Sequence, residues 1–541
     1  MFIKFSDIPG SHNLFLDYLY EFNNVKKYYN TDFRNTSEYP THLKKVADHS
    51  RPHKQELYSI IKNQYKDKNP SEKTKQLIEF LKEENSLAIV TGQQVGIIGG
   101  PLYTIFKVIT GIKLAEQLNS QYLDYKFFPV FWLEADDHDF EEIASINLIN
   151  QDNNLTTISY PLPEEEESNK GSVGYLKIEK EIDTFFEQFD ASLRNTEFKT
   201  EILNKLKSFY CIGKTFKEAF SELLFDLFDE KGLIIFDPQD KEVKRLLKPV
   251  FKNEAANYRT HSEKLIAVSA ELEETYHAQV KVRPFNLFYN YEEGRYLIEP
   301  VDNEFKLKRK RKKFSYDELI QSIENEYYNF SPNVLLRPIC QDYLFPTAFY
   351  VGGPSEVSYF AQVNVLYPLF DIPSPIIYPR SSATIVEKNI STITQKFNLE
   401  ARNIFILNET LKDKVIAELS DNSLSDLFDN SQKEVDAIFD KLKEYLFNID
   451  KTISDASDKY RQKAVNSISE LKNKSLDAQK NKYDVVSKQI DKILIAYMPN
   501  SNLQEREINI FYFINKYGFD VLNKIIDELD IQKFEHQIIN L

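Results

Sequence analysis

Five ionisable side chains crowd at the end of one predicted strand. In "FWLEADDHDFEE" they are Glu134, Asp136, Asp137, His138 and Asp139. Carboxylates this close raise one another's pKa values unless a cation, a bound amine or hydrogen bonds compensate, and a histidine beside a carboxylate can act as a general base. We predict that the last four of these residues are catalytic. A solvated acidic loop is the alternative.

A glycine-rich loop precedes this cluster in the sequence. Four of the chain's 14 glycines lie in "TGQQVGIIGG". A glycine turn that opens a helix can hold an anion through its backbone N–H groups, although this spacing matches neither the dinucleotide fingerprint nor a P-loop. Close packing of a helix on a strand is the alternative explanation. The predicted substrate- or nucleotide-binding residues here are Thr91, Gly92, Gln93, Gln94, Gly96, Gly99, Gly100, Tyr103 and Lys107.

Polar residues also interrupt a later apolar segment, residues 331–362. The candidate binding residues there are Arg337, Gln341, Asp342, Gly353, Glu356 and Tyr359. An arginine can hold a carboxylate through two parallel hydrogen bonds. Arg337 could equally pair with Asp342 and serve only the fold. A basic run, "KLKRKRKK" at residues 306–313, could hold an anion, but a solvated loop is the favoured interpretation.

The elements that must position these groups are strands of a parallel sheet. Apolar runs at residues 86–92 and 127–133 predict buried strands, and a helical pattern starts at Pro101 between them. Because ligands bind at the carboxyl ends of strands in open parallel sheets, the glycine loop and the acidic cluster should face one crevice. A further strand is predicted within residues 231–240 and a hairpin turn near residues 292–294.

The C-terminal part has a different pattern. Residues 431–498 contain no Gly or Pro, and apolar residues recur at steps of three and four, as from Val435 to Tyr460. This spacing predicts a coiled coil. Two antiparallel helices with a turn near residues 477–481 and a single longer rod are both compatible with it. The apolar seam can mediate dimerisation, and a hairpin packed on its own domain is the alternative.

Length, charge and cysteine content exclude several classes of protein. A length of 541 residues predicts two or three domains, and a formal charge of -15 argues against nucleic-acid binding. Cys211 and Cys340 fit no zinc or redox spacing, which indicates a reducing compartment. No signal peptide or membrane-spanning run is evident. We predict a cytoplasmic protein that binds neither nucleic acid nor membranes.

Three stretches together resemble one bacterial family. They are "TGQQVGIIGGPLYTIFK", "PVFWLEADDHDFEEI" and "SPNVLLRPICQDYLFPTAFYVGGPSEVSYFAQ", and the resemblance continues through "YPRSSATIVE" to "PNSNLQEREINIFYFINKYG". It therefore covers nearly the whole chain. The family is the cysteine ligase family of bacillithiol biosynthesis, the enzymes assigned to the final, cysteine-adding step.

The resemblance implies an α/β fold and a reaction. The implied domains are a Rossmann-like core with connecting insertions at residues 1–387, an α-helical coiled coil at 388–500 through which members form homodimers, and a C-terminal helical segment at 501–541 that packs back on the core. The implied reaction joins L-cysteine to the amino group of glucosaminyl-malate. A dimeric scaffold with a degenerate nucleotide-binding domain and a ligase for another amine are the alternatives.

Amide formation from a free carboxylate also needs an activating co-substrate. Analogy with class I aminoacyl-tRNA synthetases suggests ATP with magnesium and an acyl-adenylate. Under that hypothesis residues 91–100 hold phosphate or adenosine, residues 136–139 bind the amine, deprotonate it or hold a metal, and Arg337 holds a carboxylate of malate. The chain lacks the HxGH and KMSKS signatures of those synthetases, so the co-substrate stays open. Two distant cysteines and scattered histidines predict no metal site.

Overall fold

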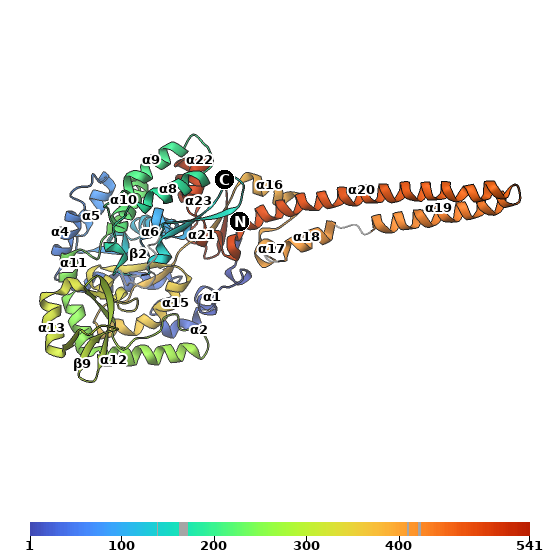
Figure 1. The fold of residues 1–541 in the computed structure, drawn as a ribbon. Helices are drawn as coiled ribbons and strands as arrows, with labels where there is room; N and C mark the ends of the chain where they lie inside the picture. Colours follow the sequence, from blue (N-terminus) through green and yellow to red (C-terminus); the bar gives the residue numbers. More distant parts are fainter. Residues whose placement is uncertain (138, 162–170, 408–409, 420–422) are drawn as a thin grey trace. The chain divides into compact units, whose positions relative to one another are not determined.

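A five-stranded parallel sheet lies at the centre of the first of two units into which this computed structural model divides (Figure 1). The structure describes residues 1–137, 139–161, 171–407, 410–419 and 423–541. The first unit comprises Met1–Ile385, Asn502–Ile539 and Leu541, and the second comprises Val386–Ser501 and Asn540. The predicted α/β class is confirmed.

The order of the strands creates a switch point. The sheet runs β13 (Ile376–Pro379), β12 (Thr347–Gly352), β2 (Ser86–Gln94), β3 (Lys126–Glu134) and β6 (Ile234–Phe236), all parallel. From β2 the chain adds β3 and β6 on one side, then returns to add β12 and β13 on the other. The direction of winding therefore reverses between β2 and β12, and ligands bind at this point in doubly wound sheets.

Burial explains why the central strands were predictable. All side chains from Leu87 to Val90 are fully buried, as expected for a strand covered on both faces. Helix α6 (Leu102–Gln121) connects β2 to β3 and is buried along most of its length. Its N-cap is Pro101, the residue at which the helical pattern begins. The three predicted strands are confirmed, each with slightly different ends.

Helices occupy much of the N-terminal region. They are α1 (Asn13–Tyr20), α2 (Phe22–Val25), α3 (Tyr39–Asp48), α4 (Lys54–Gln64) and α5 (Glu72–Phe80). Ser71 caps α5 by accepting a hydrogen bond from the Thr74 amide at 3.2 Å. Between β3 and β6 lie α7 (Phe140–Ile143), β4 (Ser145–Ile149), β5 (Leu155–Ser159), α8 (Glu181–Ser192), α9 (Lys199–Phe209) and α10 (Phe216–Phe228).

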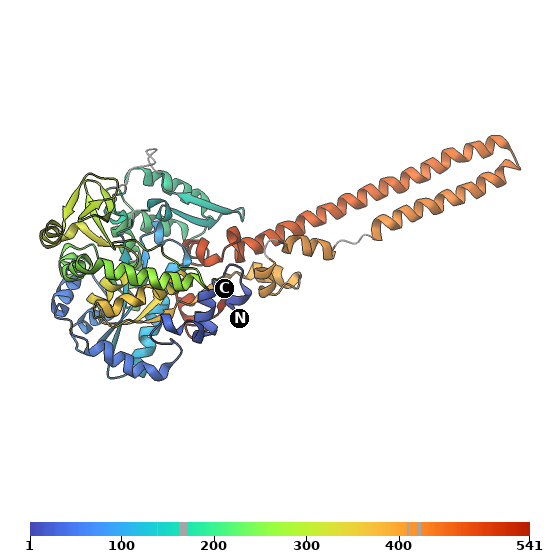
Figure 2. The same cartoon turned by 90° about the horizontal axis from the view of Figure 1, so that it is seen from below.

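A second, antiparallel sheet forms the insertion between β6 and β12 (Figure 2, yellow-green). Its strand order is β10-β9-β8-β7-β11, and the predicted hairpin turn is confirmed between β7 and β8. The elements of this insertion are α11 (Lys241–Leu246), α12 (Lys248–Glu273), β7 (Leu287–Tyr291), β8 (Gly294–Val301), β9 (Glu304–Leu307), β10 (Lys313–Ser315), α13 (Tyr316–Asn325), β11 (Phe330–Pro332) and α14 (Arg337–Leu344).

The two ends of the chain meet in a third sheet of the order β1-β15-β14. It consists of β1 (Phe2–Ile3), β15 (His536–Asn540) and β14 (Ser382–Val386). Helix α15 (Pro354–Val363) links β12 to β13, and α21 (Gln504–Glu507), α22 (Phe511–Tyr517) and α23 (Asp520–Glu528) precede β15. Residues that follow the helical region in sequence thus return to the first unit.

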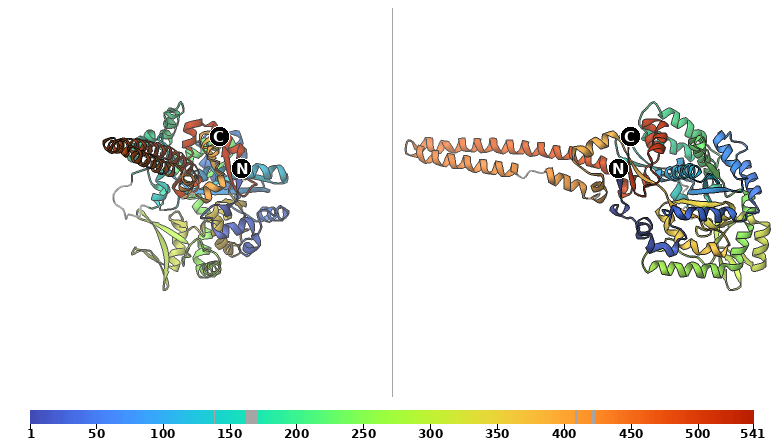
Figure 3. Two further views of the ribbon diagram at one scale, coloured as in Figure 1. Left: turned by 90° about the vertical axis from the view of Figure 1, so that its right-hand side faces the viewer. Right: turned by 180° about the vertical axis from the view of Figure 1, so that it is seen from behind.

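The second unit contains a long helical hairpin. Helices α19 (Ser423–Phe447) and α20 (Lys451–Tyr497) run side by side in the views of Figures 1 and 3. Ion pairs join Arg461 to Asp436 and Lys472 to Asp429, so the helices are antiparallel. Shorter helices precede them: α16 (Lys388–Lys396), α17 (Ala401–Ile406) and α18 (Leu411–Leu419). In the described ranges no helix has the length and apolar character needed to cross a membrane.

The predicted position of the hairpin turn, residues 477–481, is wrong. Helix α20 continues through it, and the turn lies between Phe447 and Lys451. The Asp450 carboxylate accepts hydrogen bonds from the amides of Thr452 and Ile453 and caps the new helix. A capping residue marks the turn, with no Gly or Pro between the two helices.

Candidate active site

A cavity of about 740 Å³ lies at the carboxyl ends of β2, β3 and β12, where the winding of the sheet reverses. The pocket is lined by residues 92–94 at the end of β2, by Glu134 at the end of β3 and by residues 353–356 after β12. We call this cavity the switch-point pocket. It brings together parts of the glycine loop and of the acidic cluster, which the sequence predicts at neighbouring strand ends, and adds residues of the later polar segment.

Gln94 connects the glycine loop to the acidic cluster. Its Nε2 donates hydrogen bonds to Asp137 Oδ2 at 2.7 Å and to Glu142 Oε2 at 2.9 Å. The neighbouring Gly92 packs so closely on β3 that an added Cβ would lie 2.9 Å from the carbonyl oxygen of Trp132. The sequence therefore requires glycine at this position for the two strand ends to approach each other.

Three glycine amides at the end of the glycine loop are already used. Those of Gly96, Gly99 and Gly100 donate to the carbonyls of Gln94, Gly96 and Ile97. Gly99 and Gly100 have φ values of 83° and 67°, which L side chains rarely adopt. Asn509 also holds the turn by donating to the carbonyls of Ile98 and Gly100 at 2.8 and 2.7 Å. Contacts from this loop to a ligand should therefore come from its side chains.

Lys107 joins the end of β2 to the turn after β12. Its Nζ donates to the Gly92 carbonyl at 2.8 Å and to Gln93 Oε1 at 2.9 Å, and it pairs with Glu356 Oε2 at 2.5 Å. Burial lowers the pKa of Lys107, and Glu356 opposes that shift. Glu356 also accepts hydrogen bonds from the Tyr350 hydroxyl at 2.6 Å and the Gly353 amide at 2.8 Å. This buried pair fixes one wall of the switch-point pocket.

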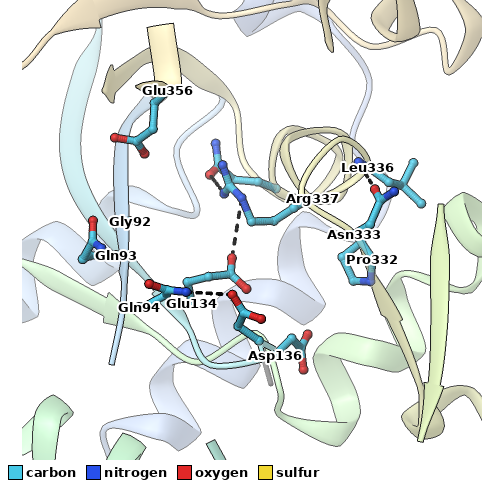
Figure 4. A network of polar contacts seen from close by, with 12 residues as sticks. Gly92, Gln93, Gln94, Glu134, Asp136, Pro332, Asn333, Leu336, Arg337 and Glu356 are labelled. Carbon is cyan, nitrogen blue, oxygen red and sulfur yellow. Dashed lines mark hydrogen bonds and ion pairs between the residues drawn. The ribbon is translucent and has the colours of Figure 1, made fainter. Parts of the chain in front are cut away.

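Arg337 lies at the start of α14. Asn333 sets this start, because its Oδ1 accepts from the amides of Leu335 and Leu336 at 3.0 Å. Figure 4 shows the Arg337 guanidinium and the Glu134 carboxylate pointing toward each other, with Nε 3.5 Å from Oε2. The guanidinium also donates to Tyr359 at 2.9 Å and to Tyr350 at 3.3 Å.

Gln341 and Asp342 lie buried behind Arg337. Arg337 donates to Gln341 Oε1 at 2.9 Å, and Gln341 Nε2 donates to Asp342 Oδ1 at 2.7 Å. Burial raises the pKa of Asp342 to about 6. Gln341 thus connects Arg337 to Asp342, so much of the hydrogen-bonding capacity of Arg337 serves the protein itself.

The structure separates the members of the acidic cluster. Asp137 lines the switch-point pocket, whereas Asp136 is buried and pairs with Lys244 at 2.6 Å. Asp139 is exposed, and its Oδ1 accepts from the Glu142 amide at 3.3 Å to cap α7. His138 lies outside the described residues. Burial acts to raise the pKa of Asp136, but Lys244 and Arg295 outweigh it and hold that pKa below its usual value.

The remaining predicted residues divide between two cavities and the interior. Gln93, Gln94 and Tyr103 line both the switch-point pocket and an adjoining cavity of about 240 Å³, which Gly96 and Gly100 also line. Burial raises the pKa of Tyr103 to about 12. Six of the predicted residues that the structure describes line neither cavity: Thr91, Gly99, Asp136, Asp139, Gln341 and Asp342. The Thr91 hydroxyl instead donates to the Val351 carbonyl at 2.9 Å.

Several basic residues of the pocket were not predicted. Arg295 on β8 donates to Ser331 Oγ and to the Pro332 carbonyl, both at 2.9 Å. Arg380 follows β13 and donates to Glu505 at 2.7 Å. The other unpredicted basic residues that line the pocket are Lys281, Arg283 and Arg506. They are spread over more than two hundred positions of the sequence, so no local pattern could group them.

The basic run at residues 306–313 does not line the pocket. It lies in the β9–β10 hairpin, where Lys310 pairs with Glu292 at 2.6 Å and Lys313 with Glu304 at 2.8 Å. These side chains are largely exposed. The structure therefore agrees with the solvated-loop interpretation.

A doubly wound parallel sheet with a polar pocket at its switch point defines a Rossmann-like enzyme. Residues 1–381 match the family model described as the N-terminal Rossmann-like domain of bacillithiol biosynthesis BshC. Residues 383–541 match the C-terminal coiled-coil domain of the same family. The chain therefore belongs to the BshC family of bacillithiol biosynthesis.

Individual relatives match over nearly the full length. Proteins from Salinibacter ruber and Chloroherpeton thalassium are 33% and 34% identical to this chain. The matches cover 98% and 94% of this chain and 96% and 92% of the relatives. Both relatives are called "Putative cysteine ligase BshC". The family predicted from the quoted sequence stretches is confirmed.

Proposed function

We propose that this chain joins L-cysteine to the amino group of glucosaminyl-malate, forming bacillithiol, and that the switch-point pocket is its active site. The observation that carries this proposal is a large polar pocket at the carboxyl ends of β2 and β12, in a chain that matches the BshC family from end to end. Its volume of about 740 Å³ lies within the usual range for small-molecule sites.

The charged groups of the pocket fit the chemistry of this substrate. Glucosaminyl-malate carries an amine, sugar hydroxyls and two carboxylates. Glu134 at the end of β3 is a carboxylate of the pocket that an ammonium group can approach, while Arg283 and Lys281 are among the basic groups. We infer that the amine lies near the end of β3 and that basic side chains hold the malate carboxylates.

A loop before β7 presents two of these basic groups. Gln362 makes two hydrogen bonds to the backbone of Val280 in this loop. Its Oε1 accepts from the Val280 amide at 2.9 Å, and its Nε2 donates to the Val280 carbonyl at 2.8 Å. Lys281 and Arg283 follow directly, line the pocket and are exposed. We assign to them the recognition of the malate carboxylates.

The double substitution Lys281→Ala with Arg283→Ala should raise KM for glucosaminyl-malate by at least about 100-fold, because two lost charge-assisted hydrogen bonds of at least about 1.5 kcal/mol each total about 3 kcal/mol. Steady-state kinetics with varied glucosaminyl-malate would measure this change. Lys308→Ala with Lys312→Ala removes the same charge outside the pocket and should leave KM unchanged. An equal rise of KM in both variants would show a general charge effect instead.

The carboxyl group of cysteine must be activated before it can form an amide, and ATP with magnesium is the co-substrate that we propose. The amides of Gly96, Gly99 and Gly100 are engaged, so we assign the phosphates to basic side chains of the pocket. The direct test is mass spectrometry of the protein incubated with cysteine and glucosaminyl-malate, with and without ATP and magnesium. Product only with ATP supports the ligase. No product from folded protein in either condition would favour the scaffold alternative.

We also propose that the protein is a cytoplasmic homodimer formed through α19 and α20. Both cysteines are free thiols, as expected in a reducing compartment. Along the hairpin the exposed fractions are 55% for Ile438, 47% for Leu442 and 77% for Tyr445. Apolar side chains in such a row are typical of a helix interface.

Substituting Ile438 and Leu442 together by glutamate should convert the dimer to a monomer, since two charges per chain would be buried at the interface. Sedimentation velocity over a range of protein concentrations would show the change in mass. The control carries Lys441→Glu and Glu444→Lys, which alter exposed polar positions of the same helix. A monomeric wild-type protein would contradict the proposal.

A further inference from the structure

We propose that Glu134 is a catalytic residue that accepts the proton of the substrate ammonium group. This inference rests on the proposed function and assigns a role within it. The ammonium N–H bond breaks, the proton passes to the Glu134 carboxylate, and the neutral nitrogen keeps the electron pair. That pair forms the C–N bond to the cysteinyl carbon of an acyl phosphate or acyl adenylate made from ATP. The C–O bond to phosphate breaks, its electrons leave with the oxygen, and the second N–H proton passes to solvent.

The position of Glu134 suits this role. It is the last residue of β3 and pairs with Gln94 of β2, so it lies beside the switch point. About a quarter of its side-chain surface is exposed, and the side chain lines the pocket. Its Oε2 is shielded from solvent and makes no hydrogen bond, the Nε of Arg337 being 3.5 Å away. The exposed part of the same carboxylate is therefore what an incoming N–H donor can reach.

The other pocket carboxylates of the described chain already accept hydrogen bonds. Asp137 and Glu142 both accept from Gln94. Glu356 pairs with Lys107 and accepts from Tyr350 and the Gly353 amide, so three donors surround it. Among the pocket carboxylates of the described residues, Glu134 is the one that accepts no hydrogen bond from another residue, so its full capacity is left for a substrate.

Burial and the charges around Glu134 bring its pKa close to neutral pH. Burial raises its pKa, Arg337 of α14 lowers it, Asp136 and Asp137 of the following loop raise it, and Arg295 of β8 lowers it. The result is a pKa of about 7. A base with a pKa near the ambient pH combines a useful deprotonated fraction with adequate strength.

The kinetic test compares Glu134→Gln with Glu142→Gln across the pH range. Glu134→Gln should lower kcat by about 100-fold near neutral pH, the usual scale for a general base. The deficit should narrow at higher pH, where the substrate amine loses its proton without help. Glu142→Gln should keep the shape of the wild-type pH profile. A Glu134→Gln deficit that is equal at all pH values, or unchanged activity, would overturn the inference.

A binding test separates this inference from the ligase assignment. Calorimetric titration with glucosaminyl-malate alone at pH 7, in two buffers of different ionisation enthalpy, measures the protons released. The wild type should release a fraction of a proton as the bound ammonium lowers the pKa of Glu134, and Glu134→Gln should release less. Such a difference without any ligation would refute the ligase and retain the Glu134 contact. Equal release would refute the Glu134 role, and no binding to the wild type would refute both.

Discussion

Replacing Lys107 by methionine should destabilise the first unit by about 3–5 kcal/mol, the usual cost of removing one partner from a buried ion pair. The Glu356 carboxylate would remain in the interior without its cation, and Gly92 and Gln93 would each lose a donor. The chain's single tryptophan, Trp132, is buried in β3 of the same sheet, so its fluorescence in a urea titration reports this loss. Ligase activity should fall by at least about 100-fold as the pocket wall shifts.

A double variant tests the cause of this instability. Lys107→Met with Glu356→Gln leaves no uncompensated charge, so it should be more stable than the sum of the two single effects predicts. The coupling should lie within about 0.5–3 kcal/mol, the range seen for residues in contact. Strictly additive losses would mean that the pair in the structure does not stabilise the pocket wall.

The second large effect is expected from Asp136→Asn. The sequence places Asp136 in a catalytic cluster, but the structure pairs it with Lys244, of whose side chain only 2% is exposed. Loss of the carboxylate leaves this lysine charged in the interior, which should cost about 3–5 kcal/mol. Urea titration of the variant measures this cost. The exposed pair Lys73–Glu116 provides the control, since Glu116→Gln should cost less than about 1 kcal/mol.

The effect of Asp136→Asn should depend on pH with a defined sign. The pKa of Asp136 is lower in the folded protein than its usual value, so the ion pair stabilises the fold above about pH 4 and loses its effect as the pH falls through the folded pKa. The stability difference between wild type and variant should be largest near pH 7 and should shrink in acid. A constant difference down to about pH 3 would mean that Asp136 is not ionised in the fold.

Much of the fold was accessible from the sequence because its signals are local. Buried strands such as β2 and β3 produce uninterrupted apolar runs, and helix α6 shows its start at Pro101. Because ligands bind at strand ends in such sheets, the sequence also predicts that the glycine loop and the acidic cluster face one crevice. The position of the hairpin turn in the second unit was not predicted correctly, because Asp450 caps α20 at a point where no Gly or Pro interrupts the helical pattern.

The sequence by itself determined the α/β class, the strand ends at which polar groups gather, the long helical region near the C-terminus and the family. Only the tertiary structure decided which carboxylate faces the pocket. Asp136 is two residues from Glu134, yet it turns to Lys244, which is 108 residues away along the chain. Glu134 instead lies beside Arg337 at the pocket. The physical reason is that the charge state and exposure of a side chain depend on partners from distant segments, which local residue spacing does not encode.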